Sequence, residues 1–400
     1  MMYTKIESTD IIIIGGGFTG GVAACSFAQN GLKVTMIEKG DRKEKNKITS
    51  DGRALAITPK SAKFLSSINI WKNIKKNITK IKEIRVSENE SNAFVHYKCN
   101  EIKSSALGYI VQSPYLNKGI QKISKKFKNL NWINNEEIYE IKFSKKDVKT
   151  KLKNKKVIIS GKIIIFADGY KSFWKKKLKQ KDTQWSYNQT GLVCNIEHEI
   201  PHMNTAFEHF KTSGPIALLP TSHPNRSSIV WSQEKTKAEI LKKLSNENFI
   251  NKARECLGNH LGKWKIKGKR FSYELKGNFT HNFIGKRTIF IGDAAHSMHP
   301  IAGQGLNLSF QGIQSLTKIL ITNKQLGVDI GKETILKKYQ YEQRIRASLI
   351  MSICHGLVNL FSINFLPIKK SRTLGMKIIQ KIPILKNYIA RYAMGENLFQ

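Results

Sequence analysis

Three glycines and one carboxylate near the start of the chain have the spacing of a nucleotide-binding loop. Gly15, Gly17 and Gly20 form a G-x-G-x-x-G motif directly after a β-branched run, and Glu38 follows 18 residues after Gly20. In such a motif the first glycine permits a tight turn, the second lets a pyrophosphate approach the backbone, and the third lets helix and strand pack closely. A carboxylate at the position of Glu38 accepts hydrogen bonds from ribose hydroxyls and repels a 2′-phosphate. The spacing therefore predicts a dinucleotide site suited to FAD or NAD.

A second cluster of polar residues and glycines lies in "GDAAHSMHPIAGQGLNLS", residues 292–309. Its two histidines, His296 and His299, are three residues apart, a spacing that can place two metal ligands on one helix face. Pro300 and Gly303 argue against a helix at that point, and no further cysteine or carboxylate has a recognisable ligand spacing. We therefore expect no metal site here.

The same stretch has features that favour a flavin. Asp293 follows an expected strand, Thr288–Ile291, and its carboxylate can hold ribityl hydroxyls. The backbone amides of Gly305 to Asn307, at the start of a helix, can face the pyrimidine edge of the ring, where negative charge gathers on reduction.

Two further groups are less specific. Arg53 lies in "SDGRALAITPKSAKFLSSINIW", which predicts a loop followed by an amphipathic helix, and by itself it reads as a surface charge near the helix start. Asp168 and Gly169 follow "VIISGKIIIF", which predicts a strand, a turn and a second strand. Ligands of open α/β sheets bind at the carboxyl ends of strands, although Asp-Gly is also a common turn dipeptide.

The elements around these residues predict an α/β fold. A strand over Asp10–Ile14, a helix ending at Gly31 and a second strand finishing at Glu38 form a βαβ unit. Between residues 183 and 281 the sequence pattern instead predicts short separated strands, such as "GLVCNIEHE", "TAFEHF", "GPIALLP" and "SSIVWSQ". We predict a Rossmann-like FAD-binding domain in two parts, residues 1–182 and 282–345. Residues 183–281 would be an inserted, mainly antiparallel β-sheet substrate domain, and residues 346–400 a C-terminal helical region that contacts a membrane.

Composition narrows the classes of partner. The formal net charge of +39 would suit a polyanion, but lysine is spread through the whole chain and no nucleic-acid-binding signature is present. We therefore expect no nucleic-acid partner. The five scattered cysteines indicate free thiols in a reducing compartment, and the N-terminus does not resemble a signal peptide. The stretch 347–368 carries no Lys, Arg, Asp or Glu, but its six polar side chains argue against a transmembrane helix.

Taken in order, the motifs resemble a known family. The glycine motif with Glu38, "DGRALAI", "ADGYKS" and "GDAAHSMHPIAGQGLNLS" are similar to those of flavin monooxygenases that hydroxylate aromatic rings. "GPIALLP", "YEQRIRAS" and the tail "LPIKKSRTLGMKIIQKIPILKNYIARYAMG" resemble the ubiquinone-biosynthesis hydroxylases among them. The resemblance extends over essentially the whole chain.

The resemblance implies a role for each candidate residue. It assigns to the ADP half of FAD the residues Gly15, Gly17, Gly20 and Glu38. Arg53 would approach the flavin and its phosphates, and Asp168 and Gly169 would lie near the pyrophosphate and the NAD(P)H path. Asp293 would bind the ribityl chain, and the loop beside the ring would contain Pro300 and Gly303, with Gly305, Leu306 and Asn307 on the pyrimidine side of the ring. His296 and His299 are then local structure. The chain departs from the family pattern at Lys175, where arginine is usual, and at Ser309 and Gly312, where glycine and aspartate are usual.

The resemblance also implies an activity: FAD-dependent hydroxylation of a polyprenylated phenol in ubiquinone biosynthesis, through a flavin hydroperoxide, with dioxygen and NAD(P)H as donor. The sequence identifies no catalytic acid or base. Two alternatives stay open, a flavin hydroxylase of a soluble aromatic acid and a non-catalytic FAD-binding member of a quinone-synthesis complex. Between Lys369 and Arg391 there are seven Lys or Arg and no acid, which favours contact with an anionic membrane surface. We expect a cytoplasmic protein, peripheral at the inner face of the membrane.

Overall fold

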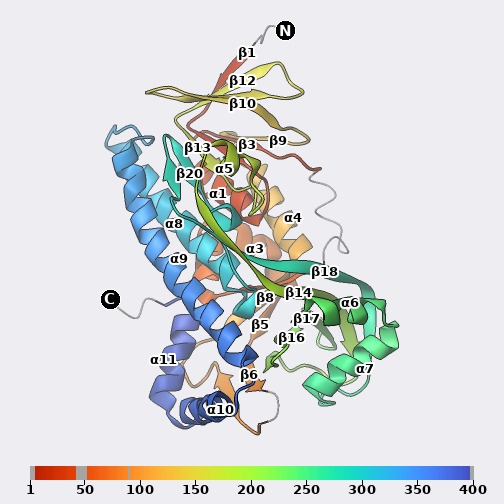
Figure 1. Ribbon diagram of the computed structural model, residues 1–400. Coiled ribbons are helices and arrows are strands. Elements are labelled where there is room, and N and C mark those ends of the chain that lie inside the picture. Colours follow the sequence, from red (N-terminus) through yellow and green to blue (C-terminus); the bar gives the residue numbers. More distant parts are fainter. Residues whose placement is uncertain (1–4, 42–51, 89–90, 397–400) are drawn as a thin grey trace.

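A computed structural model describes residues 5–41, 52–88 and 91–396, and it has the α/β architecture expected from the sequence (Figure 1). Asp51, the first residue of the "DGRALAI" motif, lies outside these ranges. The centre is a six-stranded sheet whose order is β19 (Ile284–Gly285), β20 (Thr288–Phe290), β13 (Ile163–Phe166), β2 (Ile11–Ile14), β3 (Val34–Ile37) and β9 (Leu130–Ile133). Every pair in it is parallel except β19 with β20. Strands β2, β3 and β13 are buried along their whole length, as expected for parallel strands that are covered on both faces.

Helices cover this sheet and extend from it. Helix α8 packs on α1 and α9 packs on α8, so these three lie side by side (Figure 1). The helices are α1 (Phe18–Gln29), α2 (Pro59–Ser67), α3 (Ile70–Ile74), α4 (Ser113–Ser124), α5 (Phe173–Lys177), α6 (Lys235–Lys243), α7 (Asn246–Leu257), α8 (Gln304–Gln325), α9 (Glu333–Ser362), α10 (Leu366–Lys381) and α11 (Pro383–Ala393). The βαβ unit predicted from the glycine motif is thus present as β2, α1 and β3.

A separate four-stranded sheet lies at one end, with the order β1 (Lys5–Ser8), β12 (Val157–Gly161), β11 (Val148–Leu152) and β10 (Ile138–Phe143). The sequence predicted a strand-turn-strand pair over residues 157–166, but the structure places β12 and β13 in different sheets. The single residue Lys162 joins them, and β1 and β2 make the same passage alongside. β12 and β13 therefore do not pair with each other; each pairs in parallel with a strand from the N-terminal segment, β12 with β1 and β13 with β2.

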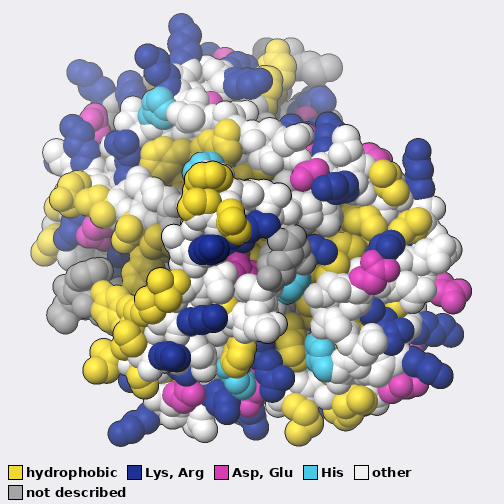
Figure 2. Space-filling view, turned by 60° about the horizontal axis from the view of Figure 1, so that its bottom comes forward, with side chains coloured by type: hydrophobic (Ala, Val, Ile, Leu, Met, Phe, Trp, Pro, Cys, Tyr) yellow, Lys and Arg dark blue, Asp and Glu magenta, His cyan; other side chains and the backbone are white. Residues whose placement is uncertain are grey.

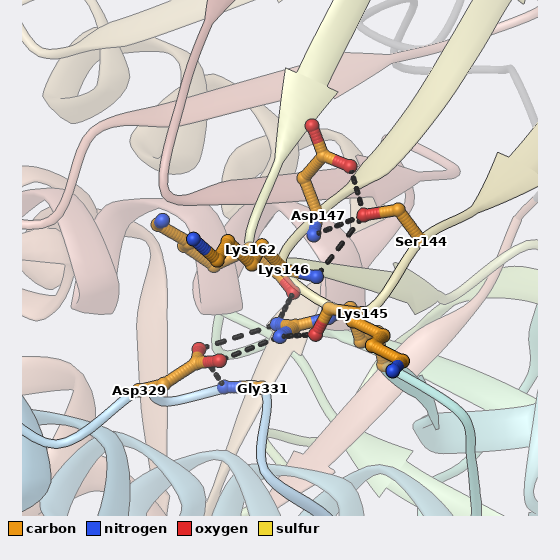
Figure 3. Close-up of polar contacts among 8 residues, drawn as sticks. Ser144, Lys145, Lys146, Asp147, Lys162, Asp329 and Gly331 are labelled. Carbon is orange, nitrogen blue, oxygen red and sulfur yellow. Dashed lines mark hydrogen bonds and ion pairs between the residues drawn. The ribbon is translucent and has the colours of Figure 1, made fainter.

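Arg287 holds this end together. Its guanidinium is buried and donates to the carbonyls of Lys145 and Lys162 and to the carboxylate of Asp329, with Nη2 to Oδ2 at 2.5 Å. Figure 3 shows Asp329 facing the backbone of Lys145 and Lys162, with Gly331 donating its backbone N–H to the same carboxylate at 3.0 Å. The planar fork of arginine therefore ties the four-stranded sheet to the connection between α8 and α9.

The second large layer is an eight-stranded sheet in the order β21 (His296–Ser297), β18 (Trp264–Thr280), β14 (Asp182–His198), β17 (Arg226–Glu234), β16 (Ile216–Pro220), β15 (Thr205–Phe210), β6 (Glu83–Glu88) and β7 (Phe94–Lys98). It is antiparallel except where β15 pairs with β6. Residues 183–281 supply most of it, and β6, β7 and β21 come from outside that range. Helices α6 and α7 close one face, where Phe249 of α7 packs against Trp231 of β17.

A small sheet links the two layers, and the C-terminal helices lie beyond it. Strand β8 (Gly108–Gln112) pairs with β4 (Ala54–Ile57) and with β5 (Ile78–Ile81). The sequence predicted only a loop before α2, so β4 is an element it missed. Helices α10 and α11 both contact β7, at the lower end of Figure 1.

Helix α9 is continuous from Glu333 to Ser362, across residue 345. Among the described residues it is the one helix whose length and composition would permit a membrane crossing. Tyr339, Gln343 and Ala347 along it are nonetheless buried against the rest of the protein, and the Gln343 amide donates to the carbonyl of Leu308 on α8.

Candidate functional site

One cavity of about 1820 Å³ lies between the central sheet and the eight-stranded sheet. It exceeds the roughly 300–1,000 Å³ typical of a pocket for one drug-sized ligand, so it has room for a dinucleotide and a second molecule. Of the thirteen candidate residues, twelve line it: Gly15, Gly17, Glu38, Arg53, Asp168, Gly169, Asp293, Pro300, Gly303, Gly305, Leu306 and Asn307. The exception is Gly20, which lies behind the wall.

The glycine motif shapes the cavity wall at the start of α1. Gly15 has φ +100°, and a Cβ there would lie 2.6 Å from the carbonyl oxygen of Ala167. A Cβ on Gly20 would lie 1.9 Å from the carbonyl oxygen of Gly15, so only glycine lets the helix approach the loop. Gly17 caps α1, and a Cβ there would meet no atom within 4 Å. The amides at the start of α1 therefore face open space that an anionic group can fill.

Glu38 is held at the end of β3, where the cavity begins. Its Oε2 accepts a hydrogen bond from the backbone N–H of Gly16, and its Oε1 accepts one from Gly40 at 2.9 Å. The side chain is buried but lines the cavity. This places a carboxylate beside the glycine loop, at the position from which it was predicted to accept hydrogen bonds from ribose hydroxyls.

Asp168 follows β13 and faces the same region. Burial raises the pKa of this carboxyl group to about 6, against a hydrogen bond from Ser172, and the nearby charge of Glu38 raises it further. Its Oδ1 is buried and has no hydrogen-bond partner among the described residues. Buried acceptors are nearly always satisfied, so this oxygen needs a donor from a bound molecule or a water.

Asp293 and Arg53 bring the two motifs together. The loop before Asp293 rests on α1, because a Cβ on Gly292 would lie 2.8 Å from Thr19. Burial raises the pKa of Asp293, and the positive charge of Arg53 opposes that rise. The Arg53 guanidinium lies 5.4 Å from the centre of the Phe18 ring. Arg53 is exposed to solvent, as its local sequence indicates, and it also lines the cavity.

The start of α8 forms the opposite wall. Its first backbone N–H groups, around Gly305 and Leu306, have no acceptor within the helix, and no acidic residue occupies its first turn. The Asn307 side chain is fully buried: it accepts from the Thr58 N–H at 2.9 Å and donates to the carbonyls of Ala56 and Gly303, each at 2.8 Å. Asn307 therefore locks α8 against β4 with its side chain, and only its backbone is left for a ligand.

The two histidines occupy different places. His299 lines the cavity with its Nε2 3.0 Å from Gln189 Oε1, whereas His296 is buried behind it, near Gln343. Burial lowers the pKa of each to about 4, so both are neutral at physiological pH. Within residues 5–41, 52–88 and 91–396, no three side chains of His, Cys, Asp or Glu form a group that could hold a metal ion.

The three departures from the family pattern have local explanations. The Lys175 ammonium is buried 2.6 Å from Asp182 and 2.9 Å from Asn278 Oδ1, so it joins α5 to the long strands and does not line the cavity. Ser309 donates its hydroxyl to the carbonyl of Gly305. A Cβ on Gly312 would lie 2.8 Å from the Gln343 amide, so glycine permits α9 to pack closely there.

The sequence predicted a β-sheet substrate domain over residues 183–281 but identified no residue at the other end of the cavity. It is lined by apolar side chains of the C-terminal helices, among them Leu357, Phe361, Met376 and Met394, and by one face of the eight-stranded sheet. Glu208 on β15 is a carboxylate within that face. The alternation in "TAFEHF" places Glu208 on the same face as Ala206 and Phe210, but a glutamate in a strand is normally expected to face water.

The described residues fit FAD. Two helices, α1 and α8, point N-termini without acidic first turns at one cavity. Glu38 and Asp293 supply acceptors for hydroxyls, Asp168 has an unsatisfied buried oxygen, and Gly17 leaves room for a pyrophosphate.

Comparisons with known proteins agree with this geometry. Residues 8–352 match the family model described as FAD binding domain. The chain is 31% identical to a ubiquinone hydroxylase, UbiL, of Rhodospirillum rubrum over 96% of this chain and 89% of that protein. It is 28% identical to the mitochondrial ubiquinone biosynthesis monooxygenase COQ6 of Dictyostelium discoideum, over 98% of this chain and 92% of that protein.

Solved structures share the fold at low sequence identity. The p-nitrophenol 4-monooxygenase PnpA of Pseudomonas putida superposes with a TM-score of 0.80 at 14% identity, covering 98% of this chain and all of that one. PqsL of Pseudomonas aeruginosa, described as a probable FAD-dependent monooxygenase, gives a TM-score of 0.75 at 17% identity, covering 92% of this chain and 99% of that one. With a family model matched over most of its length and a cavity built to hold the cofactor, this chain belongs to the FAD-binding domain family.

Proposed function

We propose that the protein is an FAD-dependent monooxygenase that hydroxylates the aromatic ring of a prenylated phenol in ubiquinone biosynthesis. The observation that carries the proposal is the shape of the large cavity, which joins a dinucleotide-binding end to an apolar end under the C-terminal helices. The names of the two relatives above support the same reaction.

Bound FAD would supply the activation of dioxygen, with NAD(P)H as the proposed source of electrons. The protein's own residues do the rest. Glu38 and Asp293 would hold the hydroxyl-bearing parts of the cofactor, and Asp168 and the start of α1 would lie near its pyrophosphate. The amides at the start of α8 would stabilise negative charge on the pyrimidine side of the flavin. The apolar wall excludes water, which would otherwise divert the activated oxygen.

The apolar end favours a prenylated phenol over a soluble aromatic acid. The Arg372 guanidinium, which lines this end, is already paired with Glu88, so it offers no free cation to the carboxylate of a soluble acid. The neighbouring Leu357, Phe361 and Met376 offer dispersion contacts that suit an isoprenoid chain.

A direct assay tests the activity. The purified holoenzyme is supplied with NADH or NADPH, ¹⁸O₂ and either a short-chain 2-prenylphenol in detergent or 4-hydroxybenzoate. We expect a prenylphenol product that has gained one ¹⁸O atom, and little product from the acid. Product from the acid alone would support the soluble-substrate alternative. FAD binding without any substrate-dependent NAD(P)H oxidation would support the non-catalytic one. Quinone-lipid mass spectra of cells lacking the protein then show which ring oxygen is missing.

We also propose that the protein is peripheral at the inner, cytoplasmic face of an anionic membrane. Large apolar side chains are exposed on α9–α11 and their connections: Phe365, Leu366, Leu374, Ile378, Ile382, Ile384 and Tyr388. Figure 2 views the molecule with the lower end of Figure 1 turned forward. In this view hydrophobic side chains gather toward the left, with Lys and Arg among and around them. Two of the seven cations in this stretch, Arg372 and Lys386, are buried in pairs with Glu88 and Glu101, so only the others can meet lipid.

Vesicle flotation tests the membrane proposal. We expect the holoenzyme to bind vesicles that contain phosphatidylglycerol and to bind phosphatidylcholine vesicles weakly, with loss of binding at high salt. Leu366→Gln with Ile384→Gln should weaken binding at least tenfold. Tyr139→Gln, which changes an exposed side chain on β10, is the matched control and should not. Equal binding by all three proteins would contradict the proposal.

A further inference from the structure

One carboxylate interrupts a row of apolar side chains across the cavity face of the eight-stranded sheet. The strand registers place Glu208 directly between Val86 on β6 and Ala217 on β16. The row continues through Val95 on one side and through Val230 and Val193 on the other. All six residues line the cavity.

Among the described residues, no salt bridge or hydrogen bond satisfies the Glu208 side chain, and burial raises its pKa to about 7. The ionisable groups nearest along the sheet are committed or neutral. Glu88, two residues along β6, accepts from Arg372, Thr373 and Ser91. Burial raises the pKa of Tyr97 on β7 to about 12, so it stays protonated. Strand β16 carries no ionisable side chain.

An unpaired carboxylate in an apolar wall is costly, and a valine or alanine like its neighbours would avoid that cost. A carboxylate that opens only into the ligand cavity is satisfied when a ligand brings a hydrogen-bond donor to it. Its neighbours on both sides can contact only apolar parts of such a ligand.

We propose that Glu208 is a catalytic residue that accepts a hydrogen bond, and then the proton, from the phenolic hydroxyl of the substrate. This deepens the proposed function and rests on it. The phenolic O–H bond breaks, an O–H bond forms on the carboxylate, and the electron pair left on the phenolic oxygen raises the electron density of the ring at its ortho and para carbons. The ring then attacks electrophilic oxygen more readily, and Glu208 later returns its proton to the phenolate or to water.

A pH near neutrality is where such a base works best, because a proton acceptor is most effective when its own pKa is close to the working pH. The direction of the pH dependence follows from the protonation of Glu208. Below about pH 7 its carboxyl group is already protonated and cannot accept the phenolic proton, so kcat/KM for a phenol should fall as the pH decreases through that value. Above it the carboxylate is ionised and the rate should level off.

The test compares wild type and Glu208→Gln on two ligands, a 2-prenylphenol and its O-methyl ether, over a range of pH. Glutamine keeps the shape and an acceptor oxygen but cannot take a proton. We expect Glu208→Gln to lower kcat/KM for the phenol about 100-fold, at the low end of the range for general bases, and to remove the acidic limb of the pH profile. For the ether, which has no proton to give, the two proteins should differ less than threefold.

Two further readouts separate a chemical role from a structural one. FAD content and the binding of the ether, followed by the change in flavin absorbance, should be the same in both proteins. The control Glu255→Gln removes an exposed carboxylate of α7 that pairs with Lys252, and it should match wild type throughout.

The outcomes are distinct. If wild type hydroxylates the phenol and Glu208→Gln does so equally well with the same pH profile, the role of Glu208 is refuted and the proposed function stands. Equal losses on phenol and ether would also refute it, since Glu208 would then only shape the cavity. If wild type hydroxylates no phenol, the proposed function itself fails.

Discussion

Glu88 on β6 and Arg372 on α10 form a buried ion pair, although 284 residues separate them in the chain. Their side chains are 1% and 5% exposed. Arg372 also donates to the carbonyl of Leu360 at 2.8 Å, at the end of α9. Burial works to raise the pKa of Glu88, but the hydrogen bonds from Thr373 and Arg372 outweigh it and the pKa is lowered. The pair therefore fastens the C-terminal helices to the sheet that forms the cavity.

Arg372→Met should release these helices. It leaves the Glu88 carboxylate buried without its cation, which costs about 3 to 5 kcal/mol of folding free energy. We expect a lower Tm and faster proteolysis between α9 and α11, while the dinucleotide end still binds FAD. Limited proteolysis with mass spectrometry measures this, with Lys252→Met, from an exposed pair, as control. An unchanged cleavage pattern would show that the pair does not hold the tail.

Gly17 and Gly20 should respond differently to alanine. A Cβ on Gly20 collides with the backbone of Gly15, so Gly20→Ala should cost about 3 kcal/mol with or without FAD. A Cβ on Gly17 meets open space, so Gly17→Ala should leave the apoprotein as stable as wild type and weaken FAD binding at least tenfold. Calorimetry and FAD titration of the two variants decide this. Normal FAD affinity in Gly17→Ala would mean that the pyrophosphate lies elsewhere.

Arg287→Lys tests the junction shown in Figure 3. Lysine keeps the charge but cannot reach Lys145, Lys162 and Asp329 at once, because it lacks the planar fork. We expect a loss of about 2 to 3 kcal/mol in the free energy of unfolding, measured by urea denaturation, with unchanged FAD affinity. A loss within error of zero would show that the carbonyls find other donors.

His296 should make the protein sensitive to acid. Its pKa is about 4 when folded against 6.5 for the free side chain, so between those values the unfolded state binds the extra proton. Stability from this residue is therefore complete above about pH 6.5 and falls as the pH decreases toward 4, by about 3 kcal/mol at most. Urea denaturation across this range should show a shallower decline for His296→Asn than for wild type. Parallel curves would contradict the assignment.

Local sequence determined the dinucleotide half of the protein. The run of isoleucines before Gly15, the glycine spacing and Glu38 fix a strand, a turn, a helix and an acceptor within 30 residues of one another, and short-range sterics suffice to specify them. The same holds for Asp293 and the start of α8, since a buried strand followed by glycines and an apolar helical stripe leaves little choice of local structure.

Tertiary structure decided what no local pattern contains. Arg53 is exposed, as its local sequence indicates, but only the fold shows that it lines the same cavity as Asp293, 240 residues later, and that its charge acts on that carboxyl group. Glu208 reads as solvent-facing until β6 and β16 are paired with β15 and turn that face toward the cavity. The basic stretch from Lys369 to Arg391 looks uniformly exposed in the sequence. In the fold, however, Arg372 and Lys386 are buried and paired with carboxylates on distant segments. In each case the energy that fixes the side chain comes from groups far away in the sequence, so only the folded chain shows which charges face the cavity and which are paired.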